Sequence, residues 1–401
     1  MRFIAGFAAF GVLAVVALPT VSEAAEMRGV SAAEIRIGQT MPYSGPVSAF
    51  GALGKGEVGY FKMLNERGGI NGRKVNLISL DDSYAPPKTV EQTRRLVESD
   101  EVALIFSSIG TAHNTAISKY LQANNVPQLF IGSGASKFSD VAQYPQATMG
   151  VQAPFRYEAR LYARYALAKN PNAKFAVISQ NDDYGRDYLL GLKDVLGDKY
   201  DSVVTAATYE ISDPTIDSQI VKLKASGADV FVIAATPKFA AQSIRKAHEI
   251  GWRPMIFLSN VAVWISTVMQ PAGPEAGIGI LSTAYVKDPD DPAWVDDPAV
   301  KGWREFMVKY VPDGDLHDTN YVNSYNSAMA LEAVLKACGD DLSTENILKQ
   351  AYSIHDLELP MLLPGIKVNT SPTDHVPVDQ MQFMRFNGKT WERFGELQTG
   401  N

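Results

Sequence analysis

The sequence has 401 residues, of which 46% are hydrophobic and 20% are charged, and its formal net charge is −7 at pH 7. This composition describes a globular chain with a sizeable core, and it lacks the basic excess that binding to nucleic acid requires. The single cysteine, Cys338, excludes an internal disulfide, so the fold has to be stabilised by packing alone, and we expect a buried, inert thiol.

The first residues are typical of a secretory signal peptide. Met1-Arg2 is followed by an apolar run at 3–18 and then by Ser22-Glu23-Ala24, with small residues at its two ends. The apolar run is short for a membrane-spanning helix. We therefore predict cleavage after Ala24 and export of the mature protein. No cysteine lies at the cleavage point, which argues against a lipid anchor.

From residue 34 the chain alternates strand-like and helix-like runs in two successive series. In the first series the strands are expected at 35–38, 75–80, 102–106 and 127–131, and the helices at 51–67, 86–98 and 113–122. In the second series the strands are expected at 175–179, 203–209 and 230–234, and the helices at 155–168, 184–196, 215–225 and 239–250. This alternation predicts two α/β lobes, each with a doubly wound parallel sheet.

The pattern changes after Gly277. We expect a strand at 278–285, an acidic, proline-broken loop at 288–297, helices at 299–310 and 321–337, and a final hairpin or edge strand at 381–386. No long linker separates the two series, which suggests that the chain crosses between the lobes more than once.

The stretch 102–111 is the strongest candidate for a binding loop. Its first half is an unbroken apolar run, as in a strand buried on both faces, and Ser107-Ser108 follows where that strand ends. Thr111 can cap the next helix, and the carboxyl ends of parallel strands and the N-termini of helices both favour anionic ligands. Many ordinary strand-to-helix turns have the same appearance, so this stretch alone does not decide the function.

No pattern of a catalytic or metal site is found. The loop 132–136 lacks the third glycine of a dinucleotide-binding fingerprint, and the five histidines show no metal-ligand spacing. The acid pairs Asp81-Asp82 and Asp182-Asp183 lie in turn-like contexts and are predicted to be solvated. Ser107 or Ser108 with His113 lacks the Gly-x-Ser-x-Gly elbow of a hydrolase. We expect no enzyme activity, no metal and no cofactor.

Several strand-end loops combine small hydroxyl residues with aromatic residues. The first contains Tyr43-Ser44 and Phe50, the third Ser107-Ser108, and the fourth Ser133 and Ser136. A polar end next to an aromatic wall suits an amphipathic small molecule.

Several motifs occur in a characteristic order: Tyr43-Ser44-Gly45-Pro46, Leu64 to Gly72 with its N-x-x-GGI-x-G pattern, Asp183-Tyr184-Gly185, and Lys224 to Val230. In this order the chain resembles, over residues 33–390, the extracytoplasmic solute-binding proteins of branched-chain-amino-acid-type ABC importers. The resemblance implies the type I periplasmic binding protein fold, two lobes joined by a three-strand hinge. It also implies a periplasmic monomer that captures a small carboxylate between closing lobes and delivers it to a membrane permease.

The resemblance assigns ligand contacts to positions in both lobes. The expected contacts are Phe50, Ser107, Ser108, Ile109, Gly134, Ala135, Ser136, Tyr184, Thr236, Asn260 and Tyr285. Ser107, Ser108 and Ile109 match the loop that receives the ligand's carboxylate, and residues 134–136 match the loop that completes the site. Phe50 and Tyr285 could instead fill the core.

One departure from the family concerns the ammonium group of an amino acid. Amino-acid-binding members offer a second-lobe acid after the strand that corresponds to 255–258, whereas this chain continues with Asn260 and Trp264 and has no acid before Glu275. A buried ammonium without a counter-charge is costly. Either Asn260 and carbonyl groups suffice, or the ligand is an aromatic or other organic acid without an ammonium. Trp264 would suit a flat or long apolar acid if it faces the cleft.

The resemblance implies crossings between the lobes near Val151, Gly277 and His375. The expected lobes are therefore 25–150 with 278–375, and 151–277 with 376–401. An exported ligand sensor that docks on a receptor, and a secreted hydrolase, are the alternatives to a role in import.

Overall fold

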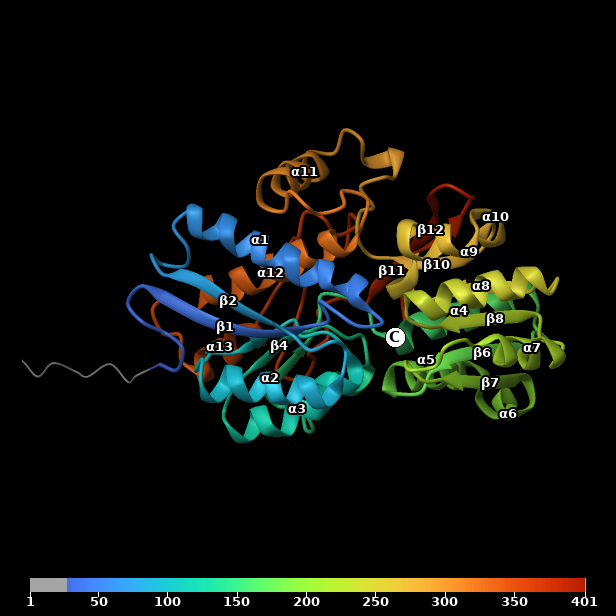
Figure 1. Cartoon of the computed structure of the whole chain (residues 1–401), viewed down its shortest axis with the longest axis horizontal. Coiled ribbons are helices and arrows are strands. Elements are labelled where there is room, and N and C mark those ends of the chain that lie inside the picture. Colours follow the sequence, from blue (N-terminus) through green and yellow to red (C-terminus); the bar gives the residue numbers. More distant parts are fainter. Residues whose placement is uncertain (1–26, 401) are drawn as a thin grey trace, which may run out of the picture.

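The structure, a computed structural model, describes residues 27–400 and has two α/β lobes side by side (Figure 1). The predicted signal peptide and its cleavage site at Ala24 lie outside the described residues. Among residues 27–400, no helix has both the length and the apolar character needed to cross a membrane.

The first lobe, on the left in Figure 1, is built on a parallel sheet with the strand order β2-β1-β3-β4-β5. Its strands are β1 (Glu34–Met41), β2 (Lys74–Asp81), β3 (Ile105–Phe106), β4 (Gln128–Ile131) and β5 (Ala147–Met149). Its helices are α1 (Gly51–Glu66), α2 (Pro86–Glu98), α3 (Thr111–Ala123), α11 (Pro298–Tyr310), α12 (Asn320–Ala337) and α13 (Thr344–Ala351). Helices α1 and α12 pack together on one face of the sheet, and α2 and α3 cover the other (Figure 1).

The second lobe has a sheet with the strand order β12-β11-β10-β9-β8-β6-β7. Its strands are β6 (Phe175–Gln180), β7 (Val204–Tyr209), β8 (Val230–Ala234), β9 (Met255–Leu258), β10 (Leu281–Ala284), β11 (Gln380–Phe386) and β12 (Trp391–Thr399). Its helices are α4 (Phe155–Lys169), α5 (Asp183–Leu196), α6 (Tyr200–Val203), α7 (Asp217–Ala225), α8 (Pro237–Glu249), α9 (Gln270–Ala272) and α10 (Pro274–Gly277). Strand β11 pairs antiparallel with both of its neighbours, β10 and β12, and β11 and β12 form the expected final hairpin.

One expected lobe boundary needs correction. Strand β10 pairs with β9 and β11, so it belongs to the second sheet, whereas the expected boundary assigned residues from 278 onward to the first lobe. The chain therefore returns to the first lobe after Ala284. A hydrophobic strand pattern predicts that a strand forms but not which sheet edge it joins, and this explains the misplacement. The boundaries near Val151 and His375 stay predictions.

The apolar core is continuous through the hinge. One cluster of buried side chains extends from the first sheet through Met149, Val151 and Phe155, which lie where the chain first crosses between the lobes, into α4 and β8. Cys338 packs in the same cluster, and burial raises the pKa of its thiol to about 12. The thiol therefore stays protonated at neutral pH, and the expectation of a buried cysteine is confirmed.

Candidate functional site

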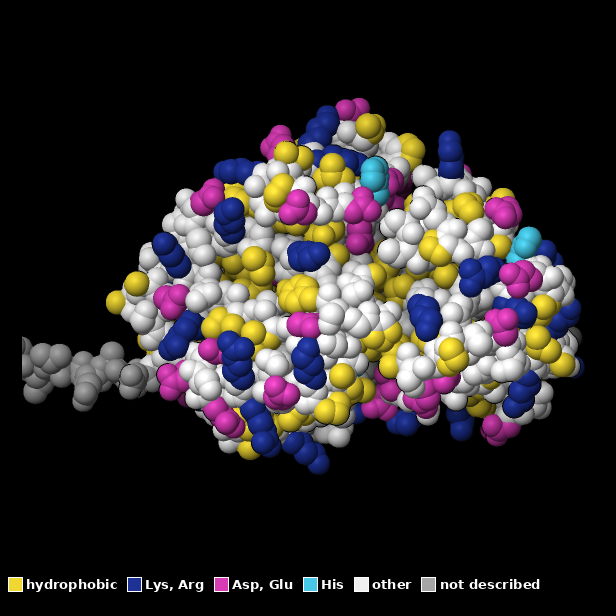
Figure 2. All heavy atoms as spheres, viewed as in Figure 1, with side chains coloured by type: hydrophobic (Ala, Val, Ile, Leu, Met, Phe, Trp, Pro, Cys, Tyr) yellow, Lys and Arg dark blue, Asp and Glu magenta, His cyan; other side chains and the backbone are white. Residues whose placement is uncertain are grey.

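A cavity lies between the two lobes. It has a volume of about 810 Å³, counted with the part that opens to solvent. Its walls come from the carboxyl ends of strands in both sheets, from the first crossing segment and from α12. In the space-filling view, hydrophobic side chains are visible along the line where the lobes meet (Figure 2). A ligand in this cavity would be enclosed by both lobes, which is the position where parallel α/β sheets bind small molecules.

The cavity brings together most of the residues that the sequence singled out. Those that line it are Phe50, Ser107, Ile109, Tyr184, Thr236, Asn260 and Tyr285. They come from six separate segments of the chain in the two lobes, and the first and the last of them are more than two hundred residues apart in the sequence. Their role in ligand binding stays a prediction.

Ser108 and residues 134–136 do not line the cavity. The Ser108 hydroxyl accepts the Thr40 N–H at 3.0 Å and so ties β1 to the end of β3. Gly134 and Ala135 are buried beneath the wall. A Cβ at residue 134 would lie only 2.9 Å from the Ala153 carbonyl oxygen, so the close packing there requires glycine. The Ser136 hydroxyl donates to Asp187 Oδ1 at 2.8 Å, and its N–H donates to the other oxygen of that carboxylate at 2.5 Å.

The bond between Ser136 and Asp187 joins the two lobes, because Asp187 lies on α5. Removing the hydroxyl leaves the nearly buried carboxylate with one partner fewer, which costs about 1.5 kcal/mol in the closed form. We expect Ser136→Ala to weaken the binding of every ligand by the same factor, about tenfold, in calorimetry. A loss confined to carboxylate ligands would contradict this assignment and make Ser136 a ligand contact. Ser202→Ala, which removes an exposed hydroxyl that donates to the Lys199 carbonyl within the second lobe, is the matched control with an effect below about threefold.

The end of β3 provides the polar end of the cavity. Ser107 has a positive φ of 51°, and Gly110, with a φ of 110°, turns the chain into α3. The ring of His113 occupies the place that a Cβ of residue 110 would take, so glycine is required there. The first N–H groups of α3, beginning at Thr111, have no carbonyl acceptors within the helix and favour an anion.

Glu57 lies behind Ser107 and is fully buried. Burial raises the pKa of its carboxyl to about 8, although hydrogen bonds from Ser107 and Gln39 act in the opposite direction. At neutral pH the group is therefore mostly protonated and carries no charge that would repel a carboxylate bound at Ser107.

Aromatic side chains form the sides of the cavity. The rings of Phe50 and Trp264 meet edge to face across the lobes, with their centroids 5.0 Å apart. Trp264 therefore faces the cleft, which the sequence left open. Phe155 and Tyr184 make a similar contact in the second lobe, with centroids 4.6 Å apart. These rings leave flat apolar surfaces for the ligand.

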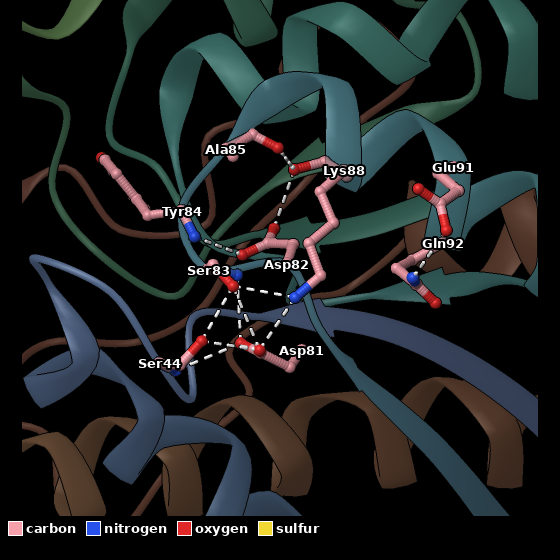
Figure 3. A network of polar contacts seen from close by, with 10 residues as sticks. Ser44, Asp81, Asp82, Ser83, Tyr84, Ala85, Lys88, Glu91 and Gln92 are labelled. Atoms are coloured by element: carbon pink, nitrogen blue, oxygen red, sulfur yellow. Dashed lines mark hydrogen bonds and ion pairs between the residues drawn. The ribbon is translucent and has the colours of Figure 1, made fainter.

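Tyr84 also lines the cavity, and the sequence analysis missed it. Figure 3 shows the polar network that holds its loop: Asp81 accepts hydrogen bonds from Ser44 and Ser83, while Asp82 accepts the Tyr84 N–H at 2.9 Å. Ser83 and Tyr84 both have positive φ values, 53° and 57°. Such conformations are costly for residues with a side chain and persist where the surroundings impose them, as this network does.

The acid pairs that were predicted to be solvated have a structural role instead. Asp82 has no exposed surface, so the prediction is wrong for this residue. In the second lobe Asp182 accepts the N–H of Tyr184 at 3.0 Å, just as Asp82 accepts that of Tyr84. In both lobes a carboxylate therefore fixes the backbone of a tyrosine two residues later, and both tyrosines line the cavity.

Amide side chains supply further polar groups. Asn320, Asn323 and Ser327 lie on one face of α12 and line the cavity, as does Gln152 in the crossing segment. Among buried side-chain atoms, Gln152 Nε2, Asn260 Nδ2 and Asn323 Oδ1 have no hydrogen-bond partner. Because buried polar atoms are nearly always paired, these three are available to a ligand or to water. The spacing of Asn320, Asn323 and Ser327 along α12 was the sequence signal that could have identified the helical part of this set.

The cavity wall carries no charge. Among residues 27–400, the side chains that line it include no Asp, Glu, Lys, Arg or His. The buried Glu158 lies behind Asn260, where it accepts that residue's N–H at 3.2 Å and the Tyr162 hydroxyl at 2.5 Å. An acid is thus present in this part of the second lobe, but its hydrogen bonds are made to the protein.

Comparisons with known proteins agree with this architecture. A family model described as periplasmic binding protein matches residues 34–390. The Leu/Ile/Val-binding protein homolog 7 of Brucella abortus is 25% identical over 341 residues, which cover 82% of this chain and 83% of that protein.

Two solved structures share the fold. One is a branched-chain amino acid ABC transporter from Thermus thermophilus with bound valine, with a TM-score of 0.80, 17% identity, and coverage of 91% of this chain and 96% of that one. The other is a fatty acid ABC transporter substrate-binding protein from Thermomonospora curvata, with a TM-score of 0.76, 18% identity, and coverage of 93% and 94%.

Proposed function

Because the chain belongs to the periplasmic binding protein family, whose fold it has, we propose that it is the solute-binding component of an ABC importer. In this proposal it captures a small amphipathic carboxylate between its two lobes in the periplasm and delivers it to a membrane permease. Closure of the lobes excludes water and strengthens the polar contacts with the ligand.

The observation that carries the proposal is the division of the cavity into a polar end and aromatic walls. The Ser107 hydroxyl and the N–H groups in the first turn of α3 face a carboxylate, and Ile109 lines the cavity beside them. Phe50, Trp264 and Tyr285 cover the apolar part. Ser108 supports this end from behind, and Ser136 holds the lobes together, so both act through positioning.

The ligand class follows from the absence of charge in the wall. An α-amino acid brings an ammonium next to its carboxylate, and none of the described side chains that line the cavity could neutralise it. The wall instead offers the unpaired amide groups of Gln152, Asn260 and Asn323. We therefore favour an organic acid without an α-ammonium. The fold itself is compatible with both classes, since the titles of its structural neighbours name valine and a fatty acid transporter.

A thermal-shift screen tests the ligand class. Residues 25–401 are screened against aromatic carboxylates, aliphatic carboxylates, α-amino acids, amides and sugars. A ligand at a hundred times its dissociation constant stabilises the folded protein by about 2.7 kcal/mol, a shift of several degrees. We expect carboxylates without an α-ammonium to shift the midpoint. If leucine or valine shifts the midpoint instead, the protein binds the ammonium without an acidic side chain in the cavity wall, and the proposed ligand class is wrong.

Delivery to a permease is tested separately. The liganded protein is expected to stimulate the ATPase activity of its cognate transporter reconstituted in vesicles. Tight binding to a receptor domain without any such stimulation would favour the exported sensor instead.

A further inference from the structure

A second cavity adjoins the first. It has a volume of about 540 Å³, counted with its opening. Four side chains line both cavities, namely Asn260, Trp264, Tyr285 and Asn323. These four side chains form the partition, that is, the boundary that the two cavities share. A ligand that extends past them from one cavity into the other would occupy both.

The second cavity differs from the first in chemistry. Most of its own wall is apolar, with Val263, Ile265, Ala284, Val286, Met384 and Trp391. Its polar groups include Asp288, His317 and Thr319, and Asp288 is the only acid that lines either cavity among residues 27–400. Asp288 Oδ1 accepts the Asp290 N–H at 2.9 Å. Burial raises the pKa of Asp288 to about 6, so this carboxyl is mostly ionised at neutral pH.

The two polar ends lie in different cavities. Ser107 and Thr111 line only the first, and Asp288 lines only the second. An α-amino acid whose carboxylate lies at α3 cannot place its ammonium in the second cavity, because the two groups share one carbon atom. A longer molecule can reach both ends, and its middle would pass the rings of Trp264 and Tyr285.

We propose that the two cavities form one elongated site, and that its ligand is an organic acid with a hydrogen-bond donor, an alcohol or an amine, at the far end. The carboxylate lies at the N-terminus of α3 and the donor lies at Asp288. The unpaired amides of Asn260 and Asn323, both in the partition, face the middle of the ligand. This inference rests on the proposed function and names the substrate class of the same site.

The test uses matched sets of acids in calorimetry. One set is 3-phenylpropionate with its 4-hydroxy and 4-amino derivatives, and the other is hexanoate with 6-hydroxyhexanoate and 6-aminohexanoate. In at least one set we expect a donor-bearing acid to bind at least tenfold more tightly than its parent, because a hydrogen bond to a carboxylate is strong. Asp288→Asn should reduce this advantage to about twofold or less. Asp296→Asn, which alters an exposed carboxylate paired with Lys301, is the control and should leave this advantage unchanged.

A second variant tests the space rather than the charge. Thr319→Phe adds a ring at a position that lines the second cavity and not the first. We expect it to weaken the longer acids at least tenfold and to leave acetate and propionate unchanged.

The outcomes separate the two proposals. If parent and donor-bearing acids bind equally and Asp288→Asn changes neither, the elongated site is wrong while capture of a carboxylate stands. If no carboxylate of any length binds, the proposed function is wrong, and the elongated site is overturned with it.

Discussion

Trp264→Ala is expected to weaken ligand binding by about 3 kcal/mol, or more than a hundredfold. The side chain is 6% exposed, contacts Phe50 across the lobes and lines both cavities. Its loss removes apolar surface from the ligand and an aromatic contact from the closed form. Large aromatic side chains in buried positions typically contribute this much. Calorimetry with the best ligand of the thermal-shift screen measures the effect.

Two controls separate ligand contact from folding. Trp294→Ala removes another tryptophan, which lies outside both cavities over Lys287 and Arg393, and should leave affinity within about twofold. Trp264→Phe keeps a ring at the partition and should recover most of the binding energy. Unchanged affinity in a folded Trp264→Ala variant would show that the ligand does not reach this wall, and both the proposed apolar cover and the elongated site would then be wrong.

The fold could be predicted because its signals are local. Strand β8, Val230–Ala234, is an unbroken apolar run and is buried along its whole length, as periodicity predicts for a parallel strand. Strand β10 shows the limit of this reasoning, since its sequence indicates a strand but contains nothing that specifies its partners.

The candidate site could be predicted in part. Ser107 and Ile109 follow a recognisable strand, and the motif order indicates where such a loop lies. Ser136 carries the same kind of hydroxyl, but its partner Asp187 is distant in sequence, so its bond between the lobes could not be inferred. Tyr84 was missed because its orientation depends on two residues with positive φ, Ser83 and Tyr84, that Asp81 and the buried Asp82 hold in place. In the sequence this stretch resembles a solvated turn.

The buried Glu57 gives the protein a pH dependence of defined sign. Its pKa is about 8 in the folded protein and near 4.5 when the chain is unfolded, so between these values the folded state binds one proton more. The stability that this proton provides is fully present below pH 4.5 and is lost as the pH rises toward 8. The slope is about 1.4 kcal/mol per pH unit, which amounts to about 2 kcal/mol between pH 6.5 and 8.

Chemical denaturation of the wild type and of Glu57→Gln across pH 6.5–8.5 tests this expectation. The window lies above the raised pKa values of about 6 at Glu158 and Asp187, so Glu57 dominates the difference between the two proteins. Glutamine preserves the size of the side chain and cannot ionise, so the variant should lose most of the slope. Above pH 8 the ionised Glu57 lies behind Ser107 and opposes a bound carboxylate, so affinity should fall in the wild type and not in the variant. Equal slopes of unfolding free energy against pH in both proteins would mean that Glu57 is already ionised at neutral pH. The interpretation that the polar end of the cavity is uncharged would then be wrong.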